Sequence, residues 1–127
     1  MKLVNIVLAG FILLACNNQD ASKANKQSQT NKAPVIEDYV ERYENSGELK
    51  ITGTLKNGVR DGLWTAWHEN GNVESEVPYI DGDRHGVMRT WYEDGKLRYK
   101  GAYANNEKIG EWIYYDKSGK EVKRVQY

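Results

Sequence analysis

The sequence predicts an all-β fold, an elongated antiparallel meander of repeated β-hairpins, preceded by a signal peptide and a disordered tether. Three observations support this prediction. The C-terminal part of the chain repeats with a period of 24 residues, glycine-containing turn signals recur at that period, and the segments after these turns alternate apolar and polar residues. We divide the 127 residues into residues 1–15, 16–34 and 35–127.

Residues 1–15 predict a signal peptide that is removed. Met1 and Lys2 give a short positive start, and residues 3–14 are almost wholly apolar. Twelve residues rise about 18 Å as a helix, too short to span a hydrocarbon core of about 30 Å. The length is typical of the apolar region of a secretory signal, so we favour that interpretation over a transmembrane anchor.

Leu13-Leu14-Ala15-Cys16 resembles the lipobox of bacterial lipoproteins. In that family a diacylglyceryl group is attached to the Cys thiol, and the signal is cut just before the Cys. The resemblance implies that Cys16 becomes an acylated first residue carrying two or three chains, which attach a protein to membrane lipid far more stably than one. The alternative is a free Cys in an ordinary signal peptide.

Residues 16–34 predict a lipidated Cys followed by a disordered tether. After Cys16 the segment contains no aromatic and no large aliphatic residue, so it buries too little apolar area to offset its ordering entropy. Asn17, rather than Asp, follows the Cys, which in enterobacteria-like sorting favours the outer membrane. We therefore expect a lipid-anchored protein of the bacterial cell envelope, on its periplasmic or surface side.

Residues 35–127 predict the repeat domain, with a half repeat opening near Tyr39 and three fuller units after it. Residues 57–64 recur as residues 81–88 and again as residues 105–112. Asn70-Gly71, Asp94-Gly95 and Ser118-Gly119 are hairpin signals, and Ser46-Gly47 is a weaker one. Three further sets keep the 24-residue spacing: Trp67, Trp91 and Tyr115, with Tyr43 one period earlier; Gly47, Gly71, Gly95 and Gly119; and Leu55, Tyr79, Tyr103 and Tyr127. We expect about eight short strands.

The segments on the two sides of each turn differ in pattern. Those after the turns alternate with period two, as in residues 49–55 and 97–103, which predicts one buried and one wet face. Before the turns, Trp64 and Trp67 are three residues apart, as are Trp112 and Tyr115. A regular strand places such a pair on opposite faces. Either a bulge rotates one of them inward, or both faces carry aromatic cover.

The unit NG-x-x-x-G-x-W-x-x-W/Y-x-x-x-G resembles the bacterial MORN-repeat variant over roughly residues 46–127. Proteins of this type are often labelled YwqK-family antitoxins, and many others are lipoproteins. The resemblance implies a non-catalytic β-hairpin array used for contacts with other molecules. Two positions depart from the pattern: Asn106, where Gly is usual, and Met88, where Trp is usual.

The residue inventory argues against several functions. Lys plus Arg and Asp plus Glu number 18 each, so the chain lacks the basic footprint that nucleic-acid binding needs. A single Cys excludes an intramolecular disulfide and a Cys-based zinc site. His68 and His85 occupy unrelated repeat positions without a nearby third ligand, so we expect them to be surface residues rather than metal ligands. No nucleophile elbow, P-loop or dinucleotide fingerprint occurs, and we expect no enzyme activity and no cofactor.

The aromatic residues are the remaining candidates for function: Trp64, Trp67, Trp91, Trp112 and Tyr115. They either fill the core of a sheet that has few aliphatic residues, which we favour, or form a row that contacts a ligand. The leading hypothesis is a lipid-anchored module that binds an envelope protein. The alternative is a lipoprotein that stacks on peptidoglycan or polysaccharide. An exported chain would not meet a cytoplasmic toxin, so an antitoxin role would require immunity against an envelope-acting toxin.

Overall fold

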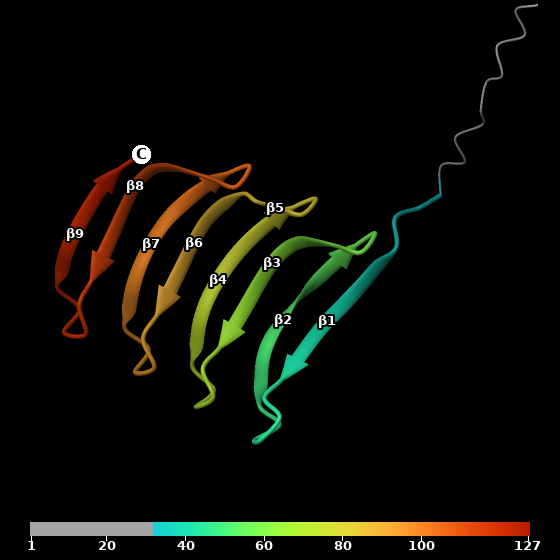
Figure 1. Ribbon diagram of the computed structural model, residues 1–127, viewed down its shortest axis with the longest axis horizontal. Coiled ribbons are helices and arrows are strands. Elements are labelled where there is room, and N and C mark those ends of the chain that lie inside the picture. Colours follow the sequence, from blue (N-terminus) through green and yellow to red (C-terminus); the bar gives the residue numbers. More distant parts are fainter. Residues whose placement is uncertain (1–31) are drawn as a thin grey trace, which may run out of the picture. The chain divides into compact units, whose positions relative to one another are not determined.

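The computed structural model describes residues 32–127, so the predicted signal peptide, Cys16 and most of the predicted tether lie outside the described residues. The described part is all-β and forms one antiparallel sheet of nine strands in the order β1-β2-β3-β4-β6-β7-β8-β9, with β5 paired to β4 (Figure 1). The predicted meander of hairpins is therefore confirmed. The strands are β1 (Ile36–Arg42), β2 (Leu49–Lys56), β3 (Val59–Trp67), β4 (Val73–Ile80), β5 (Asp83–Arg84), β6 (Gly86–Trp91), β7 (Leu97–Ala104), β8 (Glu107–Tyr115) and β9 (Glu121–Gln126).

The structure has one strand more than the expected eight because the strand that opens the middle repeat is broken. β5 and β6 are separated by His85, whose N–H donates to the Pro78 carbonyl at 3.0 Å. Gly86 follows with a φ of 114°, which only glycine adopts readily. β5 and β6 together occupy the place that β3 and β8 fill in the neighbouring repeats.

Two kinds of turn alternate along the sheet, one kind at each end of the strands (Figure 1). These two ends are called the turn edge and the loop edge, in distinction from the outer edges formed by β1 and β9. At the turn edge the turns have two residues, both with positive φ, as at Asn57 (51°) and Gly58 (80°). This is the type I′ geometry that matches the twist of a hairpin. Asn106 has a φ of 70°, and asparagine tolerates this region better than most residues. That tolerance explains why Asn106 replaces the usual glycine without losing the turn.

The predicted glycine turns are confirmed at the other end of the strands, and three of the four are three-residue loops. In the second one the Gly71 N–H donates to the His68 carbonyl at 2.9 Å, and the His68 N–H donates to the Asn72 carbonyl at 2.8 Å. The first loop is one residue longer, because it closes between Tyr43 and Glu48. The predicted equivalence of Tyr43 with Trp67 is therefore wrong. Tyr43 takes the structural position of His68, and Tyr92 and Asp116 occupy that position in the following hairpins.

One face of the sheet, called the aromatic face below, carries the hydrophobic core. Trp112 is 1% exposed and Trp64 is 5% exposed, and Met88 and Tyr103 are also buried. The two indole rings lie against Gly101 and Gly53, where any β-carbon would overlap ring atoms. A single sheet buries these large rings by laying each one flat on the backbone of the preceding hairpin.

The spacing of three residues between aromatic positions places them on opposite faces. The ladder from Trp64 to Ala66 is regular, so Trp67 points away from the aromatic face. The register shift beside Trp67 comes from one extra residue, Glu74, on the partner strand. Met88 and Trp91 repeat this arrangement, as do Trp112 and Tyr115. Of the two possibilities left by the sequence, the structure therefore has aromatic cover on both faces.

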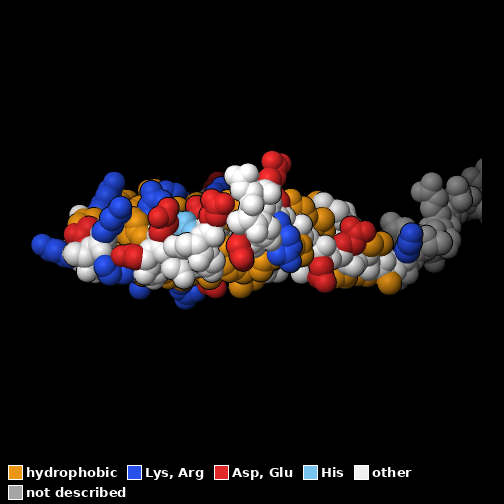
Figure 2. Space-filling view, turned by 90° about the horizontal axis from the view of Figure 1, so that it is seen from below, with side chains coloured by type: hydrophobic (Ala, Val, Ile, Leu, Met, Phe, Trp, Pro, Cys, Tyr) orange, Lys and Arg blue, Asp and Glu red, His pale blue; other side chains and the backbone are white. Residues whose placement is uncertain are grey.

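No second layer of secondary structure covers either face among residues 32–127. Figure 2 views the sheet along the edge that carries the three-residue loops, and hydrophobic side chains are visible on both of its sides. Within the same residues no helix is long and apolar enough to cross a membrane. Both faces are therefore candidate binding surfaces.

Candidate functional site

A row of cations, which was not predicted from the sequence, lies over the aromatic rings of the aromatic face. The Arg60 guanidinium lies 4.1 Å from the centre of the Trp64 ring, and Lys108 Nζ lies 4.4 Å from that of Trp112. In the middle repeat Arg84 stacks on Tyr103 at 4.1 Å. The signal was present in the sequence, because these three cations are spaced by 24 residues.

These cations make the aromatic face a packed surface. The pKa of Lys108 is raised, first because its ammonium hydrogen-bonds the Tyr127 hydroxyl, so its charge is retained over the ring. Such contacts are attractive because the cation lies over the negative face of the aromatic ring. Trp64 and Trp112 are buried beneath them and present no open ring face to a ligand. Two of the five candidate aromatic residues therefore lie in the core.

The second face carries an aliphatic stripe that crosses five strands. Leu63 pairs in register with Pro78, Val87 with Ala102, and Ala102 with Ile109. These residues alternate with the ones that face the aromatic core, so their side chains lie on the opposite side of the sheet. Leu63 is 53% exposed, Val87 49% and Ile109 44%. This stripe is not evident from the sequence, because Leu63, Val87 and Ile109 are ordinary apolar residues of strands.

The loop edge holds the other candidate aromatics, Trp67, Trp91 and Tyr115, which are half-buried. At each of the first three loops a side chain donates to a carbonyl of the next hairpin. The Tyr43 hydroxyl donates to the Trp67 carbonyl at 2.8 Å, His68 Nε2 to the Trp91 carbonyl at 3.0 Å, and the Tyr92 hydroxyl to the Tyr115 carbonyl at 2.8 Å. This ladder fixes the spacing of the hairpins at that edge.

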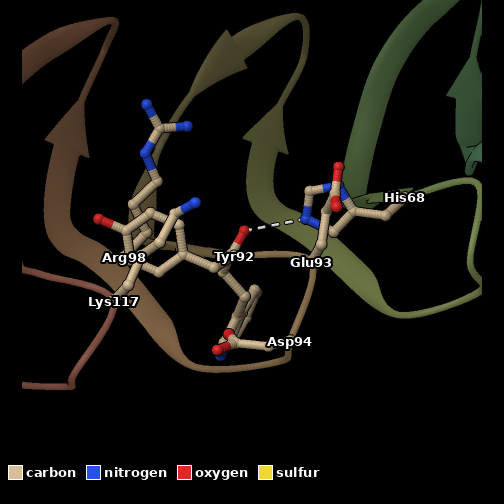
Figure 3. Close-up of a pocket in the computed structure, with 7 residues that line it drawn as sticks. His68, Tyr92, Glu93, Asp94, Arg98 and Lys117 are labelled. Atoms are coloured by element: carbon tan, nitrogen blue, oxygen red, sulfur yellow. Dashed lines mark hydrogen bonds between the residues drawn. The ribbon is translucent and has the colours of Figure 1, made fainter.

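A hollow of about 450 Å³ opens along three successive loops (Figure 3). It is lined by His68, Trp91, Tyr92, Glu93, Asp94, Arg98 and Lys117. Figure 3 shows His68 and Glu93 at one end and Arg98 and Lys117 at the other. We call this cavity the loop-edge hollow.

The charges around the loop-edge hollow are mixed. Arg98 and Lys117 bring two positive charges, and Glu93 and Asp94 bring two negative ones. The pKa of Asp94 is lowered, first because it accepts the Lys96 backbone N–H and then because it pairs with the Lys96 ammonium. With the two signs in balance, this hollow suits a polar, uncharged ligand better than a strongly charged one.

The two histidines have separate surroundings. His68 Nε2 lies beside a carbonyl oxygen, so it acts as a hydrogen-bond donor there. His85 Nδ1 lies 3.4 Å from Asn105 Oδ1 at the opposite edge of the sheet. Among residues 32–127 no group of three His, Cys, Asp or Glu side chains is placed to hold a metal ion. Cys16, the predicted lipid attachment point, lies outside these residues.

Two adjacent segments of the chain, residues 60–81 and 84–105, match the MORN repeat variant. The chain contains two MORN repeats. Each runs from a cation of the aromatic face, Arg60 or Arg84, through one loop to the following two-residue turn. Each MORN repeat is thus one hairpin together with its share of both faces, and four of the five stripe residues lie within the two repeats. No curated protein and no solved structure matches the chain.

Proposed function

We propose that this chain is a non-catalytic, lipid-anchored protein of the bacterial cell envelope whose MORN repeats bind a partner protein. The observation that carries the proposal is the aliphatic stripe, in which Leu63, Val87 and Ile109 are exposed on a face that no other element of the described residues covers. Contiguous apolar surface of this kind marks interaction sites in soluble domains, whereas scattered apolar residues do not. The partner is an envelope protein with a complementary apolar surface.

The lipid anchor supports a binding role rather than chemistry. An acylated Cys16 would hold the repeats close to the membrane, joined by the predicted tether of residues 17–34. An anchored module meets its partner at a raised local concentration, so a modest interface suffices. Replacing Cys16 by alanine is expected to move the full chain from the membrane fraction to the aqueous fraction. A variant that stays with the membrane would contradict the anchor while leaving the repeats' role untouched.

The stripe is tested by charge insertion with a matched control. Val87→Lys places an ammonium in the middle of the stripe, and Val122→Lys makes the same change at a valine that is 60% exposed on β9, outside it. Crosslinking of the full-length chain in its host, followed by mass spectrometry, is expected to capture one dominant envelope protein. Val87→Lys should abolish that capture and Val122→Lys should preserve it. Equal behaviour of the two variants would refute the assignment of the stripe.

Glycan binding is the second candidate, and the loop-edge hollow supports it. Trp91 and Tyr92 line this hollow together with polar groups of both signs, which is the kind of surface on which a sugar ring stacks and hydrogen-bonds. Trp64 and Trp112 have no part in this candidate because they are buried. Trp91→Ala should abolish cosedimentation with peptidoglycan, while Trp67→Ala, which lies outside the hollow, should not. An immunity role against an envelope-acting toxin would be a special case of the first proposal.

A further inference from the structure

The outer edges of β1 and β9 each lack a partner strand among the described residues. Exposed edges present unpaired backbone N–H and C=O groups and readily accept another strand. The sheet itself contains three junctions between successive hairpins, namely β2 with β3, β4 with β6, and β7 with β8. β9 corresponds in repeat position to β2, β4 and β7, and β1 corresponds to β3, β6 and β8. The outer edges of β9 and β1 therefore belong to the two strand types that meet at each internal junction.

All three internal junctions share one register. Ile51 pairs with Ala66, Ser75 with Thr90, and Tyr99 with Tyr114 at equivalent positions. The adjacent pairs are Thr52 with Thr65, Glu76 with Arg89, and Lys100 with Ile113. Carried over to the two edges, this register places Lys123 opposite Glu41 and Arg124 opposite Val40.

We propose that a second copy of this chain adds its β1 to the β9 of the first, so that copies join head to tail in one continuous sheet. This proposal concerns the edges of the sheet and stands apart from the proposed function, which concerns its face. In the joined pair Lys123 lies beside Glu41 of the second copy. Tyr39 of that copy lies over Val125, as Met88 packs with Val77 in the middle repeat.

The charges of the two edges are complementary. β1 carries Glu37, Asp38 and Glu41 against Arg42, whereas β9 carries Lys123 and Arg124 against Glu121. Lys123 and Glu41 also lie on the same side of the sheet. The ammonium of Lys123 is 5.6 Å from the ring centre of Tyr114, and Glu41 accepts a hydrogen bond from Tyr39 at 3.2 Å. Opposite charges in register favour this pairing, and two acidic β1 edges repel each other.

Two features limit the strength of the contact. Glu41 already pairs with Lys50 at 2.7 Å within its own chain, so the intermolecular ion pair must share its carboxylate. Each internal junction also uses a glycine with positive φ, namely Gly62, Gly86 or Gly110, where β1 has Glu37. We therefore expect the intermolecular pairing to be confined to the loop-side residues, like the two pairs between β4 and β6, without the further pairs that β5 adds to β4. We expect reversible association that weakens with added salt.

Charge reversal on the full chain tests the proposal. Lys123→Glu and Glu41→Lys each place like charges at the junction, and each should weaken self-association about tenfold in sedimentation velocity. The two variants mixed in equal amounts regain opposite charges at every junction, so the mixture should associate like the unmodified chain. Lys117→Glu makes the same change of charge in a loop and serves as the control. Far-UV circular dichroism shows whether each variant keeps its sheet.

The mixing step separates pairing from damage to the fold, because a misfolded variant does not recover when mixed. Restored association of the mixture, with Lys117→Glu unaffected, supports the head-to-tail junction. An unmodified chain that stays monomeric at millimolar concentration overturns it. So does a mixture that stays as dissociated as its components, or a loss of association by Lys117→Glu equal to that of Lys123→Glu. None of these outcomes depends on the partner that binds the stripe.

Discussion

Replacing Gly101 by alanine tests how the aromatic face is packed. The added methyl group would overlap three ring atoms of Trp112. The ring has little room to move, because Trp112 is 1% exposed and Tyr103 packs against it edge-on with centroids 5.1 Å apart. Overpacking a tight core costs about 1–3 kcal/mol. We expect a value near the top of that range, about 3 kcal/mol, which lowers the melting temperature by roughly 12–24 °C for a domain of this size.

Gly71→Ala is the matched control because the two glycines need to be glycine for different reasons. Gly71 has a φ of 86° with no atom near its missing β-carbon, whereas Gly101 has no positive φ. Alanine in the left-handed region costs roughly 1–2 kcal/mol. Thermal unfolding followed by far-UV circular dichroism should therefore rank Gly101→Ala as the more damaging change. If Gly71→Ala proves more destabilising, the ring contact is not what constrains Gly101.

The middle repeat suggests a second substitution that should compensate for a larger residue at Gly101. There Val77 and Met88 take the positions that Gly101 and Trp112 take in the last repeat, so a larger residue on one strand accompanies a smaller one on the next. Gly101→Val and Trp112→Met should each destabilise the domain by about 2 kcal/mol or more. The double variant should be at least about 1 kcal/mol more stable than the sum of the two losses predicts. Strictly additive losses would contradict this explanation of Met88.

Three further outcomes are expected. Trp112→Ala should cost about 3–5 kcal/mol in urea unfolding and Trp91→Ala clearly less, because only the first ring is buried. Tyr92→Phe should cost about 1 kcal/mol, because it removes the hydroxyl that bridges two loops. The pKa of Asp116 is lowered, first by the Ser118 hydroxyl. The carboxylate therefore stabilises the fold above about pH 4, and this contribution is lost as the pH falls further. In acid titrations followed by circular dichroism, Asp116→Asn should show a shallower loss of stability below pH 4.

The fold was predictable because three independent patterns agree with it. Repeat period, turn glycines and strand alternation all indicate hairpins, and each loop lies where its glycine predicts. The misplaced Tyr43 shows where such reasoning fails. A one-residue difference in loop length shifts structural equivalence without changing the 24-residue spacing of the glycines. The extra strand has a similar origin, because the break at His85 depends on local backbone geometry.

The candidate surfaces were less predictable, because whether two residues of one strand share a face depends on whether a bulge lies in that strand or in its partner. From the sequence alone Trp64 and Trp67 are equivalent candidates, and only the pairing shows that they lie on opposite faces. The aliphatic stripe was not predicted, because Leu63 and Val87 are ordinary apolar residues of strands. Their exposure becomes evident only from the structure, in which no second layer covers the described sheet. The cations over the rings could have been found, since Arg60 and Lys108 share one repeat position.

The core of this protein lies between hairpins rather than within them. Trp64 covers Gly53 of the preceding hairpin, and Trp112 covers Gly101. Each hairpin thus needs the next one to bury its backbone, as in other repeat arrays where stability comes from nearest-neighbour interfaces. By the same rule Val125 on β9 is the position that an aromatic residue of a following strand would cover, and no strand of the described sheet supplies one. In the proposed junction, Tyr39 on the β1 of a second copy would cover Val125.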